Sequence, residues 1–403
     1  MSESARGAGP LAGTVVVDLT RALAGPHAGM MLGDLGARVI KVETPDVGDD
    51  TRGWGPPFVQ PDDGGEPVST YFMSCNRDKE SIALDLKSAD GKETLERLVR
   101  RADVLLENFR TGVLDRLGFS TDRLLELNPR LVMLSITGFG HDGPEGGRAG
   151  YDQIAQGEGG LMSLTGSGPD DPQRVGVPIG DLLAGMYGAY GVLAALLERE
   201  RTGRGQVVRT SLLAAIVGVH AFQGTGWTVA GKVGHAQGNH HPSICPYGLF
   251  RCGDEAVQIA VGSQAQWLRL CEAFGLDPKA PGMTTNSERV EHRPEVIAAV
   301  EQVFAAYRAE ELLTMLAAAG IPAGRVRALD EVYEWEQTRS QGLLVDVDHP
   351  SLGQVTLPGS PLRFFAADGT ETTRRQHVAP PALDGDGSYV RTWLDEDGTA
   401  AHE

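Results

Sequence analysis

The first part of the chain alternates short continuous runs of apolar residues with segments in which apolar positions recur every three or four residues. Residues 14–19 form one run, TVVVDL, and residues 37–43 form another, ARVIKVE. Between them, a turn at Gly25-Pro26 precedes a helical spacing over residues 30–35. Short β-branched runs are typical of buried parallel strands, whereas a period near 3.6 is typical of a helix. The first sixty residues therefore predict a strand–helix–strand unit.

The same alternation continues further along the chain. It predicts helices at residues 95–101 and 124–127, and strands at residues 103–107 and 131–136. Strands that alternate with helices favour an open parallel α/β sheet with helices on its faces. We expect this large domain to occupy residues 1–215.

The pattern changes after residue 137. Residues 138–180 are rich in Gly, Pro and Asp, and a long irregular segment within a compact domain is often functional. Residues 181–199 predict a long helix with many small residues, which permit close packing against another backbone. Residues 220–238 contain five glycines and predict a crossing linker.

We expect residues 216–330 to form a smaller α+β domain with its linkers. Residues 249–261 predict a hairpin that turns at Gly253-Asp254, and helical spacings follow at residues 264–274, 294–306 and 310–319. The remaining residues, 331–403, contain an extended segment. We expect this C-terminal part to return to the large domain.

The charge balance narrows the range of functions. The chain has 36 Lys and Arg against 54 Asp and Glu, a net charge of −18. Such a field repels the phosphates of nucleic acids and of anionic lipids, so we expect neither nucleic acid nor a membrane as a partner. No run approaches the ~18 uninterrupted apolar residues of a membrane span. The N-terminus lacks a secretory pattern, so we expect a cytoplasmic protein. The four cysteines lack zinc-site spacing, and no metal is expected.

Basic side chains accompany two predicted strand ends and turns. In so acidic a chain they indicate either a site for a polyphosphate ligand or a solvated charged surface. Asn108 and Phe109 lie at one of these strand ends, where an aromatic ring can stack on a base. The GxGxxG spacing of nicotinamide and flavin sites is absent after the first strand. The basic residues are Arg77, Lys79, Arg110 and Arg116.

Asp181 has two interpretations. It follows a glycine at the start of the long predicted helix, where an N-cap aspartate contributes about 1 kcal/mol of helix stability. It would also lie at the mouth of a parallel sheet, at the end where α/β folds bind ligands. The local pattern alone favours the cap.

Several longer motifs resemble a known family. In order along the chain they read DLTRALAGPHAGMMLGDLGARVIKVE, DDTRGW, CNRDKESIALDLK, ENFRTGVLDRLG, GYDQIAQGEGG, VPIGDLLAG and TGRGQVV. The set resembles the class III CoA-transferases, whose superfamily also contains the α-methylacyl-CoA racemases. The resemblance is strong over residues 12–215 and looser beyond them, where PYGLFRCGD and AAAGIPAGRV carry it.

This resemblance implies a fold and a site. It implies a nucleotide-fold-like large lobe, a second lobe joined by linkers, and two chains interlocked as a homodimer. It places the catalytic aspartate on Asp181, and it implies that coenzyme A and acyl-CoA are substrates and that no cofactor is bound permanently. A small carboxylic acid would be the other partner. The positions that would contact coenzyme A are Ala24, Lys79, Asn108, Phe109, Arg116 and Tyr151.

The implied reaction is CoA transfer through aspartyl-anhydride and aspartyl-CoA intermediates on Asp181, which we expect to be ionised at pH 7 at its ordinary pKa. Racemases pair the aspartate with a histidine at the position of Tyr151, and tyrosine is a poor base at neutral pH. Racemase activity and non-catalytic acyl-CoA binding stay open as alternatives.

Two departures concern the substrate. Leu23 replaces a glutamine of the formyl-CoA and oxalate enzymes, and Glu80 replaces a common arginine, so formyl or oxalate is not favoured. His240, His241 or Arg174 could hold the far carboxylate of a dicarboxylic acyl group.

Overall fold

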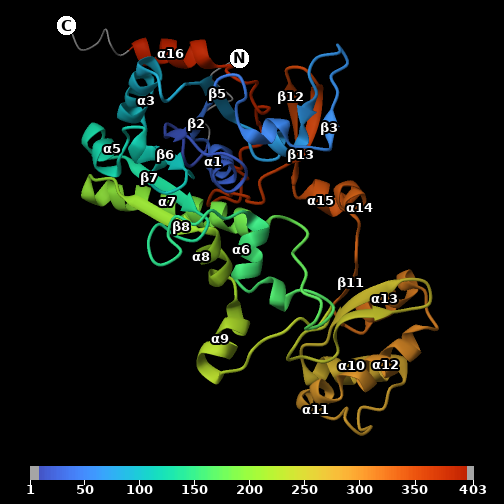
Figure 1. The fold of residues 1–403 in the computed structure, drawn as a ribbon. Coiled ribbons are helices and arrows are strands. Elements are labelled where there is room, and N and C mark those ends of the chain that lie inside the picture. Colours follow the sequence, from blue (N-terminus) through green and yellow to red (C-terminus); the bar gives the residue numbers. More distant parts are fainter. Residues whose placement is uncertain (1–8, 397–403) are drawn as a thin grey trace. The chain divides into compact units, whose positions relative to one another are not determined.

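The computed structural model describes residues 9–396, which fold into two compact units (Figure 1). The first unit comprises the residues up to Leu161, Val175–Thr225 and those from Glu336 onward, and the second comprises Met162–Arg174 and Gly226–Trp335. The chain therefore enters the second unit twice. The sequence-based boundaries at residues 215 and 330 did not separate the short segment Met162–Arg174 from the first unit.

A six-stranded parallel sheet forms the centre of the first unit. Its first strands are short apolar runs, and they lie within one residue of the runs that the sequence identified. The mixed α/β architecture with a large parallel sheet is therefore confirmed. In spatial order the strands are β5 (Lys79–Ala83), β2 (Arg38–Glu43), β1 (Val15–Asp18), β6 (Val104–Glu107), β7 (Val132–Thr137) and β8 (Val207–Ser211).

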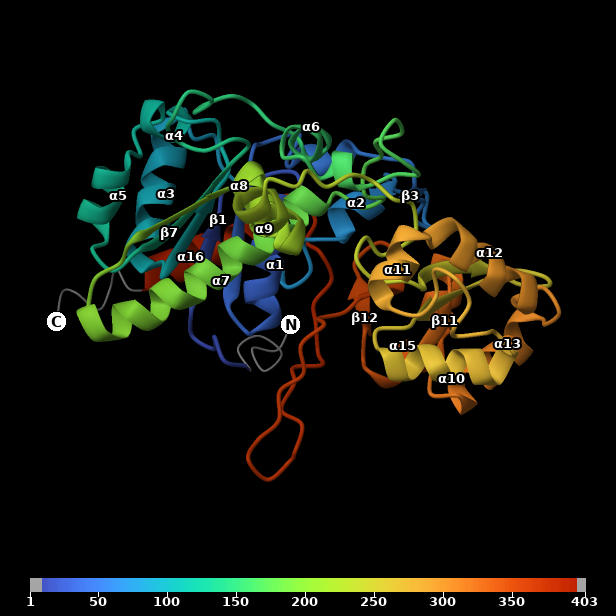
Figure 2. The same cartoon turned by 90° about the horizontal axis from the view of Figure 1, so that it is seen from below.

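Helices cover both faces of this sheet (Figures 1 and 2). Alternate strand residues point to opposite faces, so Val16 belongs to one core and Val17 to the other. One face carries α1 (Ala24–Asp34) and α7 (Ile179–Thr202), and the other carries α3 (Ala89–Arg101), α5 (Thr121–Leu127) and α16 (Gly387–Glu396). Apolar burial on both faces is what the near-continuous apolar strands require.

The long helix α7 is apolar enough in length and composition to cross a membrane. The pair α8 (Leu212–Gly218) and α9 (Ala221–Ala230) would pass the same criterion together, although the chain bends by 80° between them. One side of α7 contributes Ala184, Ala189 and Val192 to the core against α1 and the sheet. Part of its apolar composition therefore reflects packing inside the unit.

Helices α1 and α7 approach each other closely at a glycine. A Cβ atom on Gly185 would lie only 2.5 Å from the carbonyl oxygen of Ala24, the first residue of α1. This contact fixes the spacing of the two helices near their N-terminal ends, both of which lie beside the pocket described below.

The second unit has a core of its own. A three-stranded antiparallel sheet, in the order β11-β10-β9, packs with helices around Trp267, Phe250 and Phe304. The predicted hairpin and three predicted helices are present. The elements are β9 (Tyr247–Arg251), β10 (Ala256–Ala260), α10 (Gln264–Phe274), α11 (Asn286–Glu291), α12 (Arg293–Phe304), α13 (Ala309–Ala318), β11 (Ala323–Arg325) and α14 (Leu329–Glu334).

Shorter elements complete the first unit around these layers. The predicted linker at residues 220–238 is wrong in its first half, because α9 is helical despite Gly224 and Gly226. The remaining elements are η2 (Asp50–Gly53), β3 (Phe58–Val59), β4 (Val68–Ser69), α2 (Thr70–Met73), α4 (Val113–Arg116), α6 (Asp152–Glu158), α15 (Glu336–Ser340), β12 (Leu344–His349) and β13 (Gly353–Pro358); η3 (Met162–Leu164) belongs to the second unit.

Candidate active site

A pocket of about 380 Å³ opens in the first unit at the carboxyl ends of β1, β6 and β7. Residues 21–24 follow β1, residues 108–111 follow β6, and residues 136–138 with 147–153 close the side next to β7. The beginning of α7 completes the lining. The carboxyl ends of parallel strands meet at one edge, which is where open α/β sheets bind ligands.

Asp181 lies in this pocket, in the first turn of α7, but it does not cap the helix. The helix begins two residues earlier, after Pro178. Its free N–H groups are satisfied by Asp152, whose Oδ1 accepts from the Gly180 N–H at 2.8 Å and from the Asp181 N–H at 3.4 Å. The interpretation of Asp181 as the N-cap is therefore wrong, and the capping carboxylate comes from α6.

The carboxyl group of Asp181 is left without a hydrogen bond from any residue in the described range 9–396. Burial, followed by repulsion from the Asp152 carboxylate, raises the pKa of Asp181 to about 7. The expectation of an ordinary pKa is therefore also wrong, because the sequence could not show that a second carboxylate lies beside the first. A group with this pKa exchanges a proton readily at neutral pH and is more basic than an ordinary carboxylate.

Asp152 is held in place from two sides. Its Oδ1 bonds the start of α7, and its Oδ2 accepts from Nε2 of the buried Gln156 at 2.7 Å. The carboxylate that perturbs Asp181 is therefore fixed by the fold, so its effect does not depend on a mobile side chain.

Tyr71 also lines the pocket, and its ring packs edge-on against Trp54 with centroids 5.1 Å apart. Burial and then the charge of Asp181 raise the pKa of the Tyr71 phenol to about 12. The hydroxyl therefore stays protonated at physiological pH and is available as a hydrogen-bond donor. Neither aromatic was singled out from the sequence, because nothing local marks them as pocket residues.

Asn108 and Phe109 lie together in the pocket wall, as expected. The side-chain amide of Asn108 pairs with the backbone of Arg21, accepting from its N–H at 2.9 Å and donating to its carbonyl at 2.7 Å. The Arg21 guanidinium lies 5.7 Å from the centre of the Phe109 ring. The loops after β1 and β6 are thereby joined, with exposed Arg21 and Arg110 at the pocket.

The other expected contact residues divide into two groups. Ala24 is a buried part of the pocket lining, and Tyr151 lines it as a side chain that is 70% exposed. Lys79 and Arg116 do not line it. Arg116 is exposed at the end of α4, whereas Lys79 is fully buried and bonds Asp18 at 2.9 Å.

Lys79 belongs to a chain of buried charges beneath the pocket. Asp18 pairs with Lys79, while Lys41 pairs with Asp49 at 2.8 Å and donates to the Thr20 carbonyl at 2.8 Å. Asp49 also accepts from the N–H of Ala22 at 3.3 Å, a residue held at a φ of 64°. A non-glycine residue in this left-handed conformation requires support from its surroundings. The network therefore fixes the loop that forms one pocket wall.

A second cavity of about 260 Å³ shares Arg21 and Phe109 with this pocket. Half of its lining residues are aliphatic, and its charged lining residues are Arg21 and Lys87 together with Glu43 and Asp85. The aliphatic residues are Leu19, Val42, Leu84, Leu86, Val113 and Leu117.

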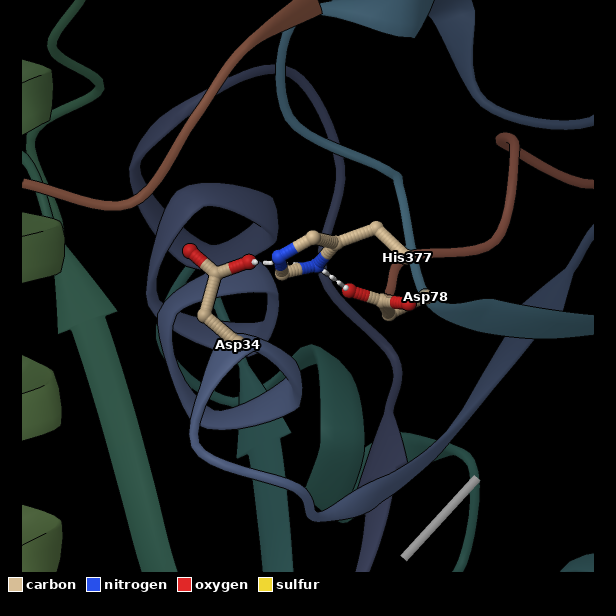
Figure 3. Close-up of side chains that lie close together, drawn as sticks. All are labelled: Asp34, Asp78 and His377. Carbon is tan, nitrogen blue, oxygen red and sulfur yellow. Dashed lines mark hydrogen bonds and ion pairs between the residues drawn. The ribbon is translucent and has the colours of Figure 1, made fainter. Parts of the chain in front are cut away.

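Asp34, Asp78 and His377 come close enough together to hold a metal ion (Figure 3). His377 Nδ1 lies 2.6 Å from Asp78 Oδ2 and 3.6 Å from Asp34 Oδ1. Both carboxylates are already paired with guanidinium groups, Asp34 with Arg77 at 2.5 Å and Asp78 with Arg374 at 2.9 Å. A dication would add charge to a cluster that is already neutralised. The arrangement fits an ion-pair clasp that holds residues 374–378 onto α1.

Comparison with known proteins gives a consistent result. Residues 11–387 match the model of CoA-transferase family III. The succinate–glutarate CoA-transferase of Agrobacterium fabrum is 40% identical over 341 residues, which cover 84% of this chain and 85% of that protein. The succinyl-CoA:glutarate CoA-transferase of Mus musculus is 38% identical over 389 residues, covering 96% and 86%. A CaiB/BaiF family crystal structure from Brucella suis superposes with a TM-score of 0.84 at 39% identity, covering 96% and 100%.

Proposed function

Because the chain belongs to CoA-transferase family III, we propose that it moves coenzyme A from an acyl-CoA to a free carboxylic acid through covalent intermediates on Asp181. One observation carries the proposal. The carboxyl group of Asp181 lies in the pocket, largely buried and without a hydrogen-bond partner within residues 9–396, and it has a pKa of about 7. A carboxylate that only stabilised the fold would be paired.

The first half of the reaction loads Asp181. One carboxylate oxygen attacks the thioester carbonyl carbon, the carbon–sulfur bond breaks, and CoA thiolate leaves an aspartyl–acyl anhydride. The thiolate then attacks the Asp181 carbonyl carbon of this anhydride. The donor leaves as a free carboxylate, and Asp181 carries CoA as a thioester.

The second half reverses these steps with a different acid. The acceptor carboxylate attacks the aspartyl thioester, which releases CoA thiolate and forms a second anhydride. The thiolate attacks the acceptor's carbonyl carbon, so the new acyl-CoA leaves and the Asp181 carboxylate is restored. No net proton or electron is consumed.

The surroundings of Asp181 favour these steps. A pKa near 7 makes the ionised form more nucleophilic than an ordinary carboxylate, while about half of the molecules are ionised at neutral pH. The protonated Tyr71 hydroxyl is a hydrogen-bond donor available to the oxyanion that forms at each addition. The carboxylate of Asp181 acts on the carbonyl carbon that it attacks, and the hydrogen bond from Tyr71 acts on the oxyanion formed at that carbon.

The two cavities that share Phe109 suggest how coenzyme A binds. The aliphatic cavity accepts the adenine, with the Phe109 ring as a stacking surface, and Arg21 and Arg110 take the phosphates. Asn108, Ala24 and Tyr151 then flank the pantetheine chain on its way to Asp181. Lys79 acts from beneath, through the buried network, and exposed Arg116 adds positive charge near the nucleotide.

The acids exchanged are proposed to be short dicarboxylates. Relatives over most of the chain are named for succinate and glutarate, and others for oxalate and mesaconate. His240 and His241 lie in the second unit, where their rings pack against Phe250 and Tyr247.

A homodimer is also part of the proposal. The outer side of α7 exposes Tyr190 by 72% and Leu197 by 71%, and α9 exposes Trp227 by 58% and Val229 by 84%. Large apolar side chains exposed on a helix are costly to leave in water and favour a second copy as their cover. Light scattering at micromolar concentration would report the mass.

Trapping the covalent intermediate tests the reaction directly. Hydroxylamine added with succinyl-CoA should convert the activated Asp181 to a hydroxamate, which peptide mass spectrometry locates and which stops turnover. Asp181→Ala should show neither modification nor transfer. Full activity in that variant would refute the proposal. Loss of α-deuterium from a 2-methylacyl-CoA without any acid conversion would indicate a racemase, and tight CoA binding without either reaction would indicate a binding protein.

A further inference from the structure

One face of the central sheet changes from apolar to polar at its carboxyl edge, on the side that α3 and α5 cover. Strand register aligns Glu107 with Ser135, and Ser135 with Arg209. The row two residues earlier on the same strands is apolar and belongs to the core or packs against it. Those residues are Leu105, Met133 and Val207.

Glu107 and Ser135 are buried and hydrogen-bonded to each other, with the Ser135 hydroxyl donating to Glu107 Oε1. The second oxygen of Glu107 accepts from the N–H of Phe109 at 2.9 Å. The Ser135 hydroxyl oxygen also lies 2.6 Å from Nε2 of His141. A chain of hydrogen bonds therefore runs from the backbone of Phe109 to the imidazole of His141.

The direction of each bond follows from the protons available. A serine hydroxyl has one proton, and here it goes to Glu107. His141 must therefore donate from Nε2, which assigns the Nε2–H tautomer. Burial and then Arg209 hold the pKa of His141 below its ordinary value, against the opposing effect of Asp142, so this neutral form predominates at neutral pH. His141 can therefore donate to Ser135 without becoming positively charged.

This chain joins two parts of the pocket wall. Phe109 stands in the loop of residues 108–111, and His141 stands in the glycine-rich loop of residues 138–150. At the far end of that loop, Gly150 returns against Gly138: a Cβ on Gly138 would lie 2.6 Å from the Gly150 nitrogen. Fixing His141 therefore restricts the backbone of the loop that leads to Tyr151.

The three side chains lie away from the reacting carboxyl group. Neither Glu107, Ser135 nor His141 lines the pocket that contains Asp181. They face another cavity of about 130 Å³, which shares Phe109, Arg110 and Thr111 with that pocket and is also lined by Arg209 and Asp115. Their connection to the Asp181 pocket therefore runs through the loops that they hold.

We propose that Glu107, Ser135 and His141 are positioning residues, which hold the two loops in register for acyl-CoA and so set its KM, while the covalent steps at Asp181 proceed without them. This inference rests on the proposed transferase function. The loop of residues 108–111 carries Asn108 and Phe109, so a loop released from Glu107 loses pre-organisation of the nucleotide contacts. Ordering that loop then costs free energy when acyl-CoA binds, which weakens the binding.

Two amide substitutions of His141 test its hydrogen bond to Ser135, because they differ only in the length of the side chain. In His141→Gln the side-chain amide nitrogen occupies the place of Nε2 and can donate to Ser135, whereas in His141→Asn the shorter amide reaches only the place of Nδ1. We expect His141→Asn to raise KM for acyl-CoA, and Kd for free CoA by calorimetry, about five- to tenfold with kcat within about twofold. His141→Gln should stay within about twofold of the wild type.

Ser135→Ala removes the central hydroxyl and should reproduce the effect of His141→Asn. If this buried change prevents folding, the two His141 variants carry the test alone, with thermal melting as the check of their fold. Unchanged CoA affinity in His141→Asn would overturn the inference, and so would a His141→Gln variant that behaves like His141→Asn. Calorimetry separates the two proposals, since CoA affinity can be measured even if no transferase activity is found.

Discussion

Two aspartates in the first unit, fully buried Asp18 at the end of β1 and half-buried Asp181 at the start of α7, have opposite electrostatic surroundings. Burial alone would raise the pKa of Asp18, but Lys79 and Lys41, together with the Thr20 hydroxyl, outweigh it and hold that pKa below its ordinary value. Burial likewise raises the pKa of Asp181, and there the neighbouring charge is Asp152, which raises it further, to about 7.

Burial raises the pKa at both sites, so the opposite directions of the two shifts follow from the sign of the neighbouring charge. A buried carboxylate with a cation beside it is satisfied and serves as a rigid support for the pocket loop. A buried carboxylate beside another carboxylate keeps its lone pairs available and its proton loosely held. Removing or changing either member of each pair therefore tests the comparison.

The largest effect is expected at the unpaired member. Asp181→Ala should lower kcat by about 10⁴-fold or more, since it removes the atom that forms both covalent intermediates. Steady-state CoA transfer measures the loss, and circular dichroism should show an unchanged fold. A residual rate within tenfold of the wild type would mean that another group carries the acyl chain.

The paired member should respond in stability instead. Asp18→Asn leaves Lys79 and Lys41 buried with one carboxylate fewer, and we expect a loss of about 3–5 kcal/mol in the free energy of unfolding. Urea denaturation at pH 7 measures it. Exposed Arg97→Gln, which breaks an ion pair with Asp395, is the matched control and should cost less than about 1 kcal/mol.

Neutralising Asp181 should have the opposite sign. Below about pH 4 the carboxyl is protonated in both the folded and the unfolded chain, so it has no effect. Between about pH 4 and pH 7 the unfolded chain releases the proton first, and the folded state loses stability as the pH rises. Asp181→Asn should therefore stabilise the protein by up to about 4 kcal/mol at pH 8 and by almost nothing at pH 4. Equal effects at both pH values would contradict the raised pKa.

Asp152→Asn sharpens the comparison further. The amide oxygen can still accept from the Gly180 N–H, but the charge that repels ionisation of Asp181 is gone. The acid limb of the pH profile of kcat/KM for acyl-CoA should shift to lower pH by about one unit, while burial keeps it above the value of a free aspartate. An unshifted limb would assign it to another group.

The smallest effect is expected from Tyr71→Phe. The ring and its packing on Trp54 remain, and only the hydroxyl is lost. We expect kcat to fall about tenfold with KM for acyl-CoA little changed, as for a donor used mainly in the transition state. A change confined to KM would place the hydroxyl on the ground-state substrate.

Much of the sheet could be predicted from the sequence because buried parallel strands are apolar. β1, β2, β6 and β7 were predicted from apolar runs alone. β5 was missed because it begins with Lys79 and Glu80, two charged residues that are buried only because Asp18 and Arg38 pair with them. No local pattern contains those partners.

The site followed the same rule. Asp181, Asn108 and Phe109 could be placed at strand and helix ends, and the structure brings them into one pocket with Ala24 and Tyr151. The pKa of Asp181 and the true cap of α7 depend on Asp152, 29 positions earlier in the chain. Residues far apart in the sequence determine this pKa and this cap, and they also determine that Lys79 lies beneath the pocket.

The contact between Gly185 and the Ala24 carbonyl limits how this scaffold can diversify. Any side chain at that position would force α1 and α7 apart and move the loop at residue 24 and the carboxyl of Asp181 together, with loss of both. New substrate preferences are therefore accessible through single mutations in the loops at residues 50–54 and 147–151, which contribute to the pocket lining and lie outside α1 and α7. We therefore expect α1 and α7 to vary little at their contact, and the loops that line the pocket to vary more.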